Sequence, residues 1–211
     1  MGCGLLCKYC WVSDVVRFQP ATVGKFYEPE DVARILTKMA KKQNLKQLRV
    51  SGGEPTIGRS HLLQLLQNLE GQPHLFILET NGILIGNEPQ YAEDLSKHRF
   101  LHVRVSLKGC NETEFATLTG AKPEGFNLQL RALENLVRAG VRCHPAAMTS
   151  FSPKQSLLQL TQRLKHISSR LAEELEIEEL ILYPNVKQKI EKHHLTYYTA
   201  YTPEGVPKER I

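Results

Sequence analysis

Three cysteines lie close together at the start of the chain, in the sequence Cys-Gly-Leu-Leu-Cys-Lys-Tyr-Cys. They are Cys3, Cys7 and Cys10. Because thiolates are soft ligands, three of them in one short loop can hold an iron–sulfur cluster or a thiophilic metal. A structural zinc site needs a fourth cysteine or histidine, and the first histidine of the sequence is His61. The loop therefore favours a cubane cluster with one iron free for an external ligand, as a catalytic cluster requires.

Polar motifs stand at the ends of three apolar segments further along the chain. In chain order they are Gly52-Gly53-Glu54-Pro55, Glu79-Thr80-Asn81-Gly82 and the pair Ser106 and Lys108. Glycine lets the backbone come close to a ligand, and Glu54 offers an acceptor for an ammonium group. Each motif taken alone also fits a simple turn, and Lys108 taken alone fits a solvated surface lysine.

Taken together, these motifs resemble the signature of the radical S-adenosylmethionine (radical SAM) superfamily, in the form of a small activase-like member. The cysteines, with Tyr9 before the last of them, resemble its three-three-two signature. The segment from Gly52 to Pro55 looks like the family's G-G-E-P motif, which contacts the amino group of the methionine moiety. The segment from Glu79 to Gly82 resembles the acidic-T-N-G segment of activases. Ser106 replaces the acid of their D-x-K motif, whereas Lys108 keeps its cation.

The resemblance implies an enzyme with two cofactors, a [4Fe-4S] cluster and S-adenosylmethionine. Reductive cleavage of the coordinated sulfonium gives a 5′-deoxyadenosyl radical that abstracts a hydrogen atom from the substrate, with an electron donor such as a flavodoxin or ferredoxin as partner. The implied cluster ligands are Cys3, Cys7 and Cys10. The implied S-adenosylmethionine-binding residues are Tyr9, Gly52, Gly53, Glu54, Pro55, Glu79, Thr80, Asn81, Ser106 and Lys108.

Several functional questions stay open at this point. No catalytic residue is singled out, and the substrate is expected to be bulky or anionic: a protein or peptide, an RNA or a small molecule. Ser106 argues slightly against a glycyl-radical activase. The alternative is a non-catalytic iron–sulfur or metal-binding protein, either a degenerate paralogue or a partner subunit. Cys110 and Cys143 stand alone in the sequence and are expected to be buried structural thiols.

Alternating helical and strand-like patterns must position these residues. Apolar residues at helical spacing predict helices over 28–43, around 62–69, over 88–97, over 126–139 and over 154–173. Short apolar segments predict strands over 46–51, 74–79, 100–107, 141–148 and 177–182. Strands separated by helices imply right-handed parallel β-α units. We therefore expect an α/β fold with a core domain over 1–183 and a C-terminal tail over 184–211 that is loosely docked.

The expected architecture is a partial (β/α)6 TIM-like barrel, because an eight-unit barrel takes ~250 residues. Only Met1 and Gly2 precede Cys3. We therefore expect the first strand to be missing from this chain, through truncation or substitution by another segment. Polar residues alternate with apolar ones along 101–107, and predict a wet, basic lumen that contains Arg104, Ser106 and Lys108. Arg49, His102 and Arg142 are expected deeper in the barrel. For these three, a side chain that points into the lumen and a structural ion pair at the barrel floor are equally good expectations.

Composition bounds the class of protein. The chain has 211 residues, of which 41% are hydrophobic and 23% charged, so it is an ordinary globular protein rather than a disordered or fibrous one. The net charge of +5 permits an anionic partner but does not indicate nucleic acid. We see no apolar run long enough for a membrane span and no signal peptide, and expect a soluble, cytoplasmic protein.

Overall fold

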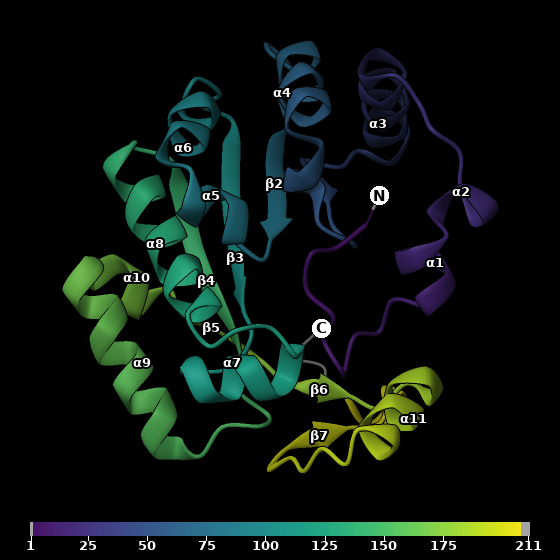
Figure 1. The fold of residues 1–211 in the computed structure, drawn as a ribbon. Helices are drawn as coiled ribbons and strands as arrows, with labels where there is room; N and C mark the ends of the chain where they lie inside the picture. The colour runs from purple at the N-terminus through teal and green to yellow at the C-terminus, as the bar shows by residue number, and fades with distance from the viewer. Residues whose placement is uncertain (1, 208–211) are drawn as a thin grey trace.

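A curved parallel β-sheet forms the centre of the computed structural model, which describes residues 2–207 (Figure 1). Its five strands follow one another in chain order. They are β1 (Gln47–Val50), β2 (Leu75–Thr80), β3 (Leu101–Leu107), β4 (Arg142–Met148) and β5 (Glu176–Glu178). Each strand is parallel to its neighbours, so all the strands end at one edge of the sheet. The motifs that follow the strands are therefore brought together.

Helices connect the strands and cover the outer face of the sheet (Figure 1). The longer ones are α3 (Pro29–Gln43), α4 (Arg59–Asn68), α6 (Pro89–Ser96), α7 (Glu112–Thr119), α8 (Gly125–Arg138) and α9 (Lys154–Ile167). Short elements between them are η1 (Pro55–Gly58), α5 (Ile83–Asn87) and α10 (Ser169–Glu173). Right-handed crossovers between consecutive parallel strands place these helices on the same side. The N-terminal segment, with α1 (Asp14–Phe18) and α2 (Pro20–Val23), lies on the concave side.

The apolar side chains of the strands pack under these helices. Val103, Val105 and Leu107 of β3 are fully buried, whereas Arg104 and Ser106 between them face the concave side. Gly86 lets α5 pack closely on α8, because a Cβ at this position would overlap the carbonyl oxygen of Leu128. The predicted alternation along this strand is thus confirmed.

The α/β class and the parallel sheet are confirmed, but the sheet is open. It has five strands, with β1 and β5 at its edges, so the expected partial (β/α)6 TIM-like barrel is not confirmed. The predicted helix over 154–173 is two helices, α9 and α10, because the backbone is extended at Ser168. The predicted strand over 177–182 is also divided. Its first part is β5, and its second part is β6 (Leu180–Ile181), which leaves the main sheet and pairs with β7 (Ala200–Tyr201).

The C-terminal region contains more structure than its sequence suggested. Helix α11 (Pro184–Lys192) follows β6, and η2 (Pro203–Gly205) follows β7. Val186 and Ile190 of α11 are buried, which fixes the helix against the rest of the molecule. The expectation of a loosely docked tail is wrong for this helix. The domain boundary at residue 183 stays a prediction, and residues 208–211 of the predicted tail lie outside the described residues.

Within residues 2–207, no helix combines the length and the apolar character that crossing a membrane requires.

Candidate cofactor-binding site

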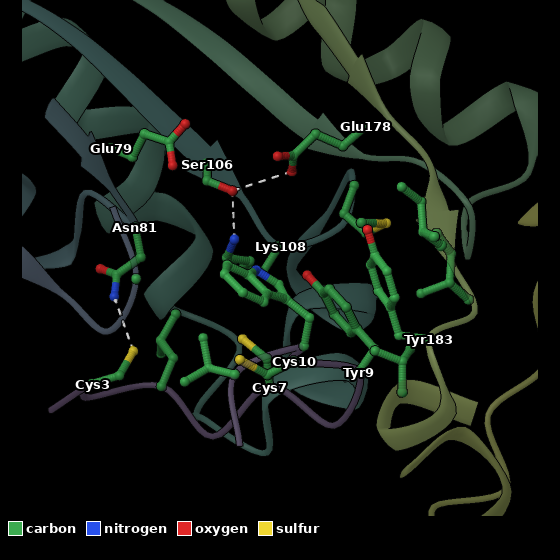
Figure 2. Close-up of a pocket in the computed structure, with 18 of the residues that line it drawn as sticks. Cys3, Cys7, Tyr9, Cys10, Glu79, Asn81, Ser106, Lys108, Glu178 and Tyr183 are labelled. Atoms are coloured by element: carbon green, nitrogen blue, oxygen red, sulfur yellow. Dashed lines mark hydrogen bonds between the residues drawn. The ribbon is translucent and has the colours of Figure 1, made fainter. Parts of the chain in front are cut away.

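A cavity of about 920 Å³ opens at the edge of the sheet where the strands end. The cysteine loop forms one wall, and the ends of the strands with the β6–α11 region form the others. Figure 2 shows the cysteines on one side, and Glu79, Ser106 and Glu178 on the opposite side. All the predicted site residues line this cavity except Pro55, which begins η1 instead. Segments far apart in the sequence therefore build one site.

The three cysteines have free thiols, and all of them line the cavity. Burial is the largest influence on the pKa of Cys7 and raises it to about 11, although Lys108 and Arg17 act in the opposite direction. Burial also raises the pKa of Cys3. The thiols of Cys3 and Cys7 are therefore held protonated, and a metal must displace these two protons when it binds.

The cysteine loop is anchored from several parts of the chain. The amide of Glu54 donates to the Gly2 carbonyl at 2.7 Å, and the Arg17 guanidinium donates to the Leu5 carbonyl at 3.2 Å. Lys189 of α11 donates to the carbonyls of Cys10 and Val12 at 3.0 and 2.9 Å. The side-chain nitrogen of Asn81 lies 3.9 Å from the sulfur of Cys3. These contacts fix the loop without using a thiol as a donor.

The three cysteines fit an iron–sulfur cluster, and the Tyr9 hydroxyl fits a second bound group. Among residues 2–207, no three His, Cys, Asp or Glu side chains gather closely enough to bind a single metal ion. Thiolates of a cubane cluster bind different irons and so do not converge on one point. The hydroxyl of Tyr9 is buried at the cavity, and no described residue forms a hydrogen bond with it. Such a hydroxyl is costly unless a bound group supplies its partner.

The Glu54 carboxylate ties the end of β1 to the end of β2. It is 5% exposed, and it accepts hydrogen bonds from the amide and hydroxyl of Thr56, the hydroxyl of Thr80 and the amide of Asn81, at 2.6 to 3.1 Å. Gly53 beside it has a φ of +59°, and a Cβ there would lie 2.8 Å from the Gly2 carbonyl oxygen. The glycine is therefore required for the loop to meet the N-terminal segment.

Gln129 of α8 is a positioning residue that the sequence reasoning missed. It is 0% exposed, and its amide nitrogen donates to the carbonyls of Asn81 and Ser106 at 2.6 and 3.0 Å. Its oxygen accepts from the amide of Lys108 at 3.0 Å. One side chain thus fixes the loops that follow β2 and β3. A signal was present in the sequence, because a glutamine stands on the apolar face of this helix beside Leu133.

Five glutamates and three cationic side chains line the cavity, so the prediction of a basic lumen is wrong. Arg104 forms ion pairs with Glu176 at 2.8 Å and with Glu178 at 2.7 Å. Arg49 pairs with Glu79 at 2.8 Å. Hydrogen bonds from Arg104 are the largest cause of the depressed pKa of Glu176. The short strand β5 supplies acids that the sequence reasoning did not place in the lumen.

Of the deeper residues, Arg49, His102 and Arg142 make structural contacts. The Nε2 atom of His102 lies 2.6 Å from Nδ1 of His144, and Nε2 of His144 lies 3.1 Å from a carboxylate oxygen of Glu176. Arg142 donates to the Arg99 carbonyl at 2.7 Å. Lys108 is held differently, because its ammonium donates to the hydroxyl of Ser106 and forms no ion pair with a described carboxylate. Its charge is therefore available to a ligand.

Comparisons with known proteins identify the family of this chain. A family model described as the radical SAM superfamily matches residues 1–151. A probable GTP 3',8-cyclase of Methanococcus vannielii is 29% identical over 140 residues, which cover 66% of this chain and 43% of the cyclase. The pyruvate formate-lyase-activating enzyme of Clostridium pasteurianum is 27% identical over 200 residues, which cover 93% of this chain and 78% of that enzyme.

Solved structures show the same fold. The crystal structure of Streptococcus suis SuiB bound to S-adenosylmethionine has a TM-score of 0.69 at 16% identity, and the match covers 96% of this chain and 48% of SuiB. The chain also spans less than half the length of the cyclases that it matches, 43% and 37% for two of them. Radical SAM enzymes use a [4Fe-4S] cluster and S-adenosylmethionine, as the resemblance implied. On the family match over residues 1–151, this chain belongs to the radical SAM superfamily.

Proposed function

We propose that the chain is a radical SAM enzyme that binds a [4Fe-4S] cluster through Cys3, Cys7 and Cys10 and S-adenosylmethionine in the adjoining cavity. The observation that carries this proposal is that three free thiols, Gly53 and Lys108 line one cavity although they are far apart in the sequence. When both cofactors are bound, they supply a radical that removes a hydrogen atom from the substrate.

The residues of the cavity have separate tasks in this proposal. The backbone at Gly52 and Gly53 approaches the methionine moiety, and the cation of Lys108 faces its carboxylate. Glu54, whose oxygens already accept protein hydrogen bonds, keeps these loops in place. The buried Tyr9 hydroxyl donates to a cofactor polar group.

The remaining assignments of the cavity concern Glu79, Thr80, Asn81 and Ser106. Asn81 points its amide toward Cys3, and Ser106 orients the ammonium of Lys108. Thr80 donates to Glu54, and Glu79 forms the ion pair with Arg49 described above. We therefore propose that Asn81 and Ser106 act on the cofactors through these contacts. Thr80 and Glu79 fix the position of the loop that follows β2.

The substrate is proposed to be bulky. The cavity continues beyond the cysteine side to Glu178, Tyr183 and Tyr201, and Trp11 at its rim is 65% exposed. The structural relatives include SuiB bound to its precursor peptide SuiA. A peptide substrate is consistent with this open rim. The alternative of a non-catalytic iron–sulfur protein is not favoured, because the cavity keeps the groups for S-adenosylmethionine as well as the cysteines.

Anaerobic reconstitution tests the proposal. The chain is loaded with iron and sulfide, reduced with dithionite and incubated with S-adenosylmethionine, and 5′-deoxyadenosine is measured. We expect product from the parent and from Cys143→Ala, whose thiol is buried away from the cavity. We expect none from Cys7→Ala, which also fails to hold the full cluster. A fully loaded parent that forms no 5′-deoxyadenosine contradicts the proposal.

A further inference from the structure

Carboxylates line the side of the cavity that lies opposite the cysteines. Glu79 belongs to β2, and Glu176 and Glu178 stand two positions apart on β5, so the two glutamates of β5 point to the same face of the sheet. Their side chains are 47% and 22% exposed, so a molecule in the cavity can reach both carboxylates. Neither glutamate of β5 has a task in the proposed binding of the cofactors.

These carboxylates outnumber the guanidinium groups that pair with them. Arg49 lies 2.8 Å from Glu79. Arg104 lies 3.8 Å from Glu79, 2.8 Å from Glu176 and 2.7 Å from Glu178. Two positive charges therefore face three negative charges, and this network of ion pairs keeps an excess of one negative charge.

The groups around this network leave the excess charge in place. In its neutral form, His144 donates from Nε2 to Glu176 and accepts at Nδ1 from His102, so both rings are satisfied without adding a charge. The ammonium of Lys108 donates to the Ser106 hydroxyl. In the proposed function this ammonium faces the carboxylate of S-adenosylmethionine, so the cofactor balances its charge. One negative charge then remains beside β5.

The Tyr9 hydroxyl is a second unused acceptor in the cavity. Tyr9 is 8% exposed, its ring packs 5.2 Å from that of Phe151, and its hydroxyl has no hydrogen-bond partner among the described residues. Figure 2 shows the ring pointing into the cavity. Burial is the largest cause that raises the pKa of this hydroxyl and Glu178 contributes, so the two groups lie within electrostatic reach of each other. A hydroxyl that donates to a cofactor can still accept a hydrogen bond. Glu178 accepts from Arg104 and Ser106, and a carboxylate has ~four acceptor sites.

We propose that the substrate carries an organic cation, an ammonium or a guanidinium group, that binds to Glu178 and to the Tyr9 hydroxyl. The proposal rests on the proposed function, which makes this cavity the place where the substrate meets the cofactors. A cationic group has only donors, so it satisfies acceptors on both sides and balances the excess negative charge. Tyr183 and Tyr201 line the same part of the cavity and offer aromatic faces, which also attract cations. The same carboxylates repel an anionic substrate.

The experiment measures the affinity of short peptides by anaerobic equilibrium dialysis. The probes are alanine peptides with blocked ends and a central lysine, arginine, norleucine or glutamate. The protein is reconstituted with its cluster and used with and without saturating S-adenosylmethionine, and no reductant is added, so that no turnover occurs. Glu178→Gln removes the charge of the proposed site. The matched control Glu174→Gln removes the same charge from an exposed pair with Arg170, outside the residues that line the cavity.

We expect the parent and Glu174→Gln to bind the better of the two cationic peptides about tenfold more tightly than the norleucine peptide, and the glutamate peptide most weakly. This preference should disappear in Glu178→Gln, and the better peptide identifies the cationic group. Equal affinity of the parent for the cationic and norleucine peptides overturns the proposal, even where Glu178→Gln fails to fold. A preference that survives in folded Glu178→Gln also overturns it.

Two further outcomes separate the cation site from the cofactor site. If S-adenosylmethionine displaces the cationic peptide, the acceptors belong to the cofactor and the proposal is overturned. If the loaded parent forms 5′-deoxyadenosine with dithionite but shows no preference for a cation, only the cation site is refuted. A measured preference without 5′-deoxyadenosine formation refutes the proposed function and leaves the cation-binding site standing.

Discussion

Replacing Glu54 with alanine should destabilise the protein even in the absence of any cofactor. The substitution removes the acceptor of two buried amides, those of Thr56 and Asn81, and of the Thr80 hydroxyl. A buried donor left without a partner costs about 1–3 kcal/mol, so the loss of a partner for these three donors should cost about 3–9 kcal/mol. That is a large part of the ~5–15 kcal/mol that stabilises a typical domain. Urea unfolding of the cofactor-free chain, followed by circular dichroism, measures the change.

Two further variants sharpen this test. Glu54→Gln keeps one acceptor oxygen but turns its amide nitrogen, a donor, toward another donor of the protein. Its free energy of unfolding should therefore lie between that of the parent and that of Glu54→Ala. Glu134→Ala removes an exposed i,i+4 ion pair with Arg138 and should cost no more than ~1 kcal/mol. If Glu54→Ala unfolds at the same urea concentration as the parent, and loses only its affinity for S-adenosylmethionine, then Glu54 is a ligand and its role as a tie between loops is refuted.

Three other predictions follow from buried or paired groups. Gln129→Leu should lower the free energy of unfolding by about 3 kcal/mol, because three backbone groups lose their partner, and unchanged urea unfolding would contradict its positioning role. Arg104 depresses the pKa of Glu176, so this pair contributes stability that is present above the ordinary glutamate pKa and is lost as pH falls through the lower pKa of the folded state. Glu176→Gln should therefore make the free energy of unfolding less dependent on pH in acid. If acid-unfolding titrations of the parent and the variant coincide, the ion pair contributes nothing to stability. Burial raises the pKa of Cys110 to about 11 and that of Cys143 to about 12. Both thiols should therefore resist alkylation at neutral pH until the chain unfolds. Mass spectrometry detects the labelled thiols, and rapid labelling of either one in native protein would contradict this prediction.

Local signals in the sequence were enough to predict residues that line one cavity. The cysteine spacing and the glycines at Gly52 and Gly53 act through short-range chemistry, and the parallel order of the strands then placed them at one edge. The alternation along β3 also predicted correctly that Ser106 faces the cavity. Each of these inferences depends on a few adjacent residues or on one repeating pattern.

The features that sequence reasoning missed depend on contacts between distant segments. Strand β5 has three residues, too few to show an alternation, so the acids that neutralise Arg104 were not assigned to the lumen. How far a sheet curves toward a barrel depends on strand number and register, which apolar patterns do not report. Helix α11 presents only Val186 and Ile190 to the core, too weak a period to be read as a helix.

The hydrogen bonds of Lys189 to the cysteine loop span almost the entire sequence, since 179 positions separate Lys189 from Cys10. During synthesis Cys10 leaves the ribosome 179 positions before Lys189, which anchors its loop. The loop therefore takes its final shape only after most of the polypeptide has been made. A cofactor that needs the anchored loop can therefore bind only after Lys189 has been made.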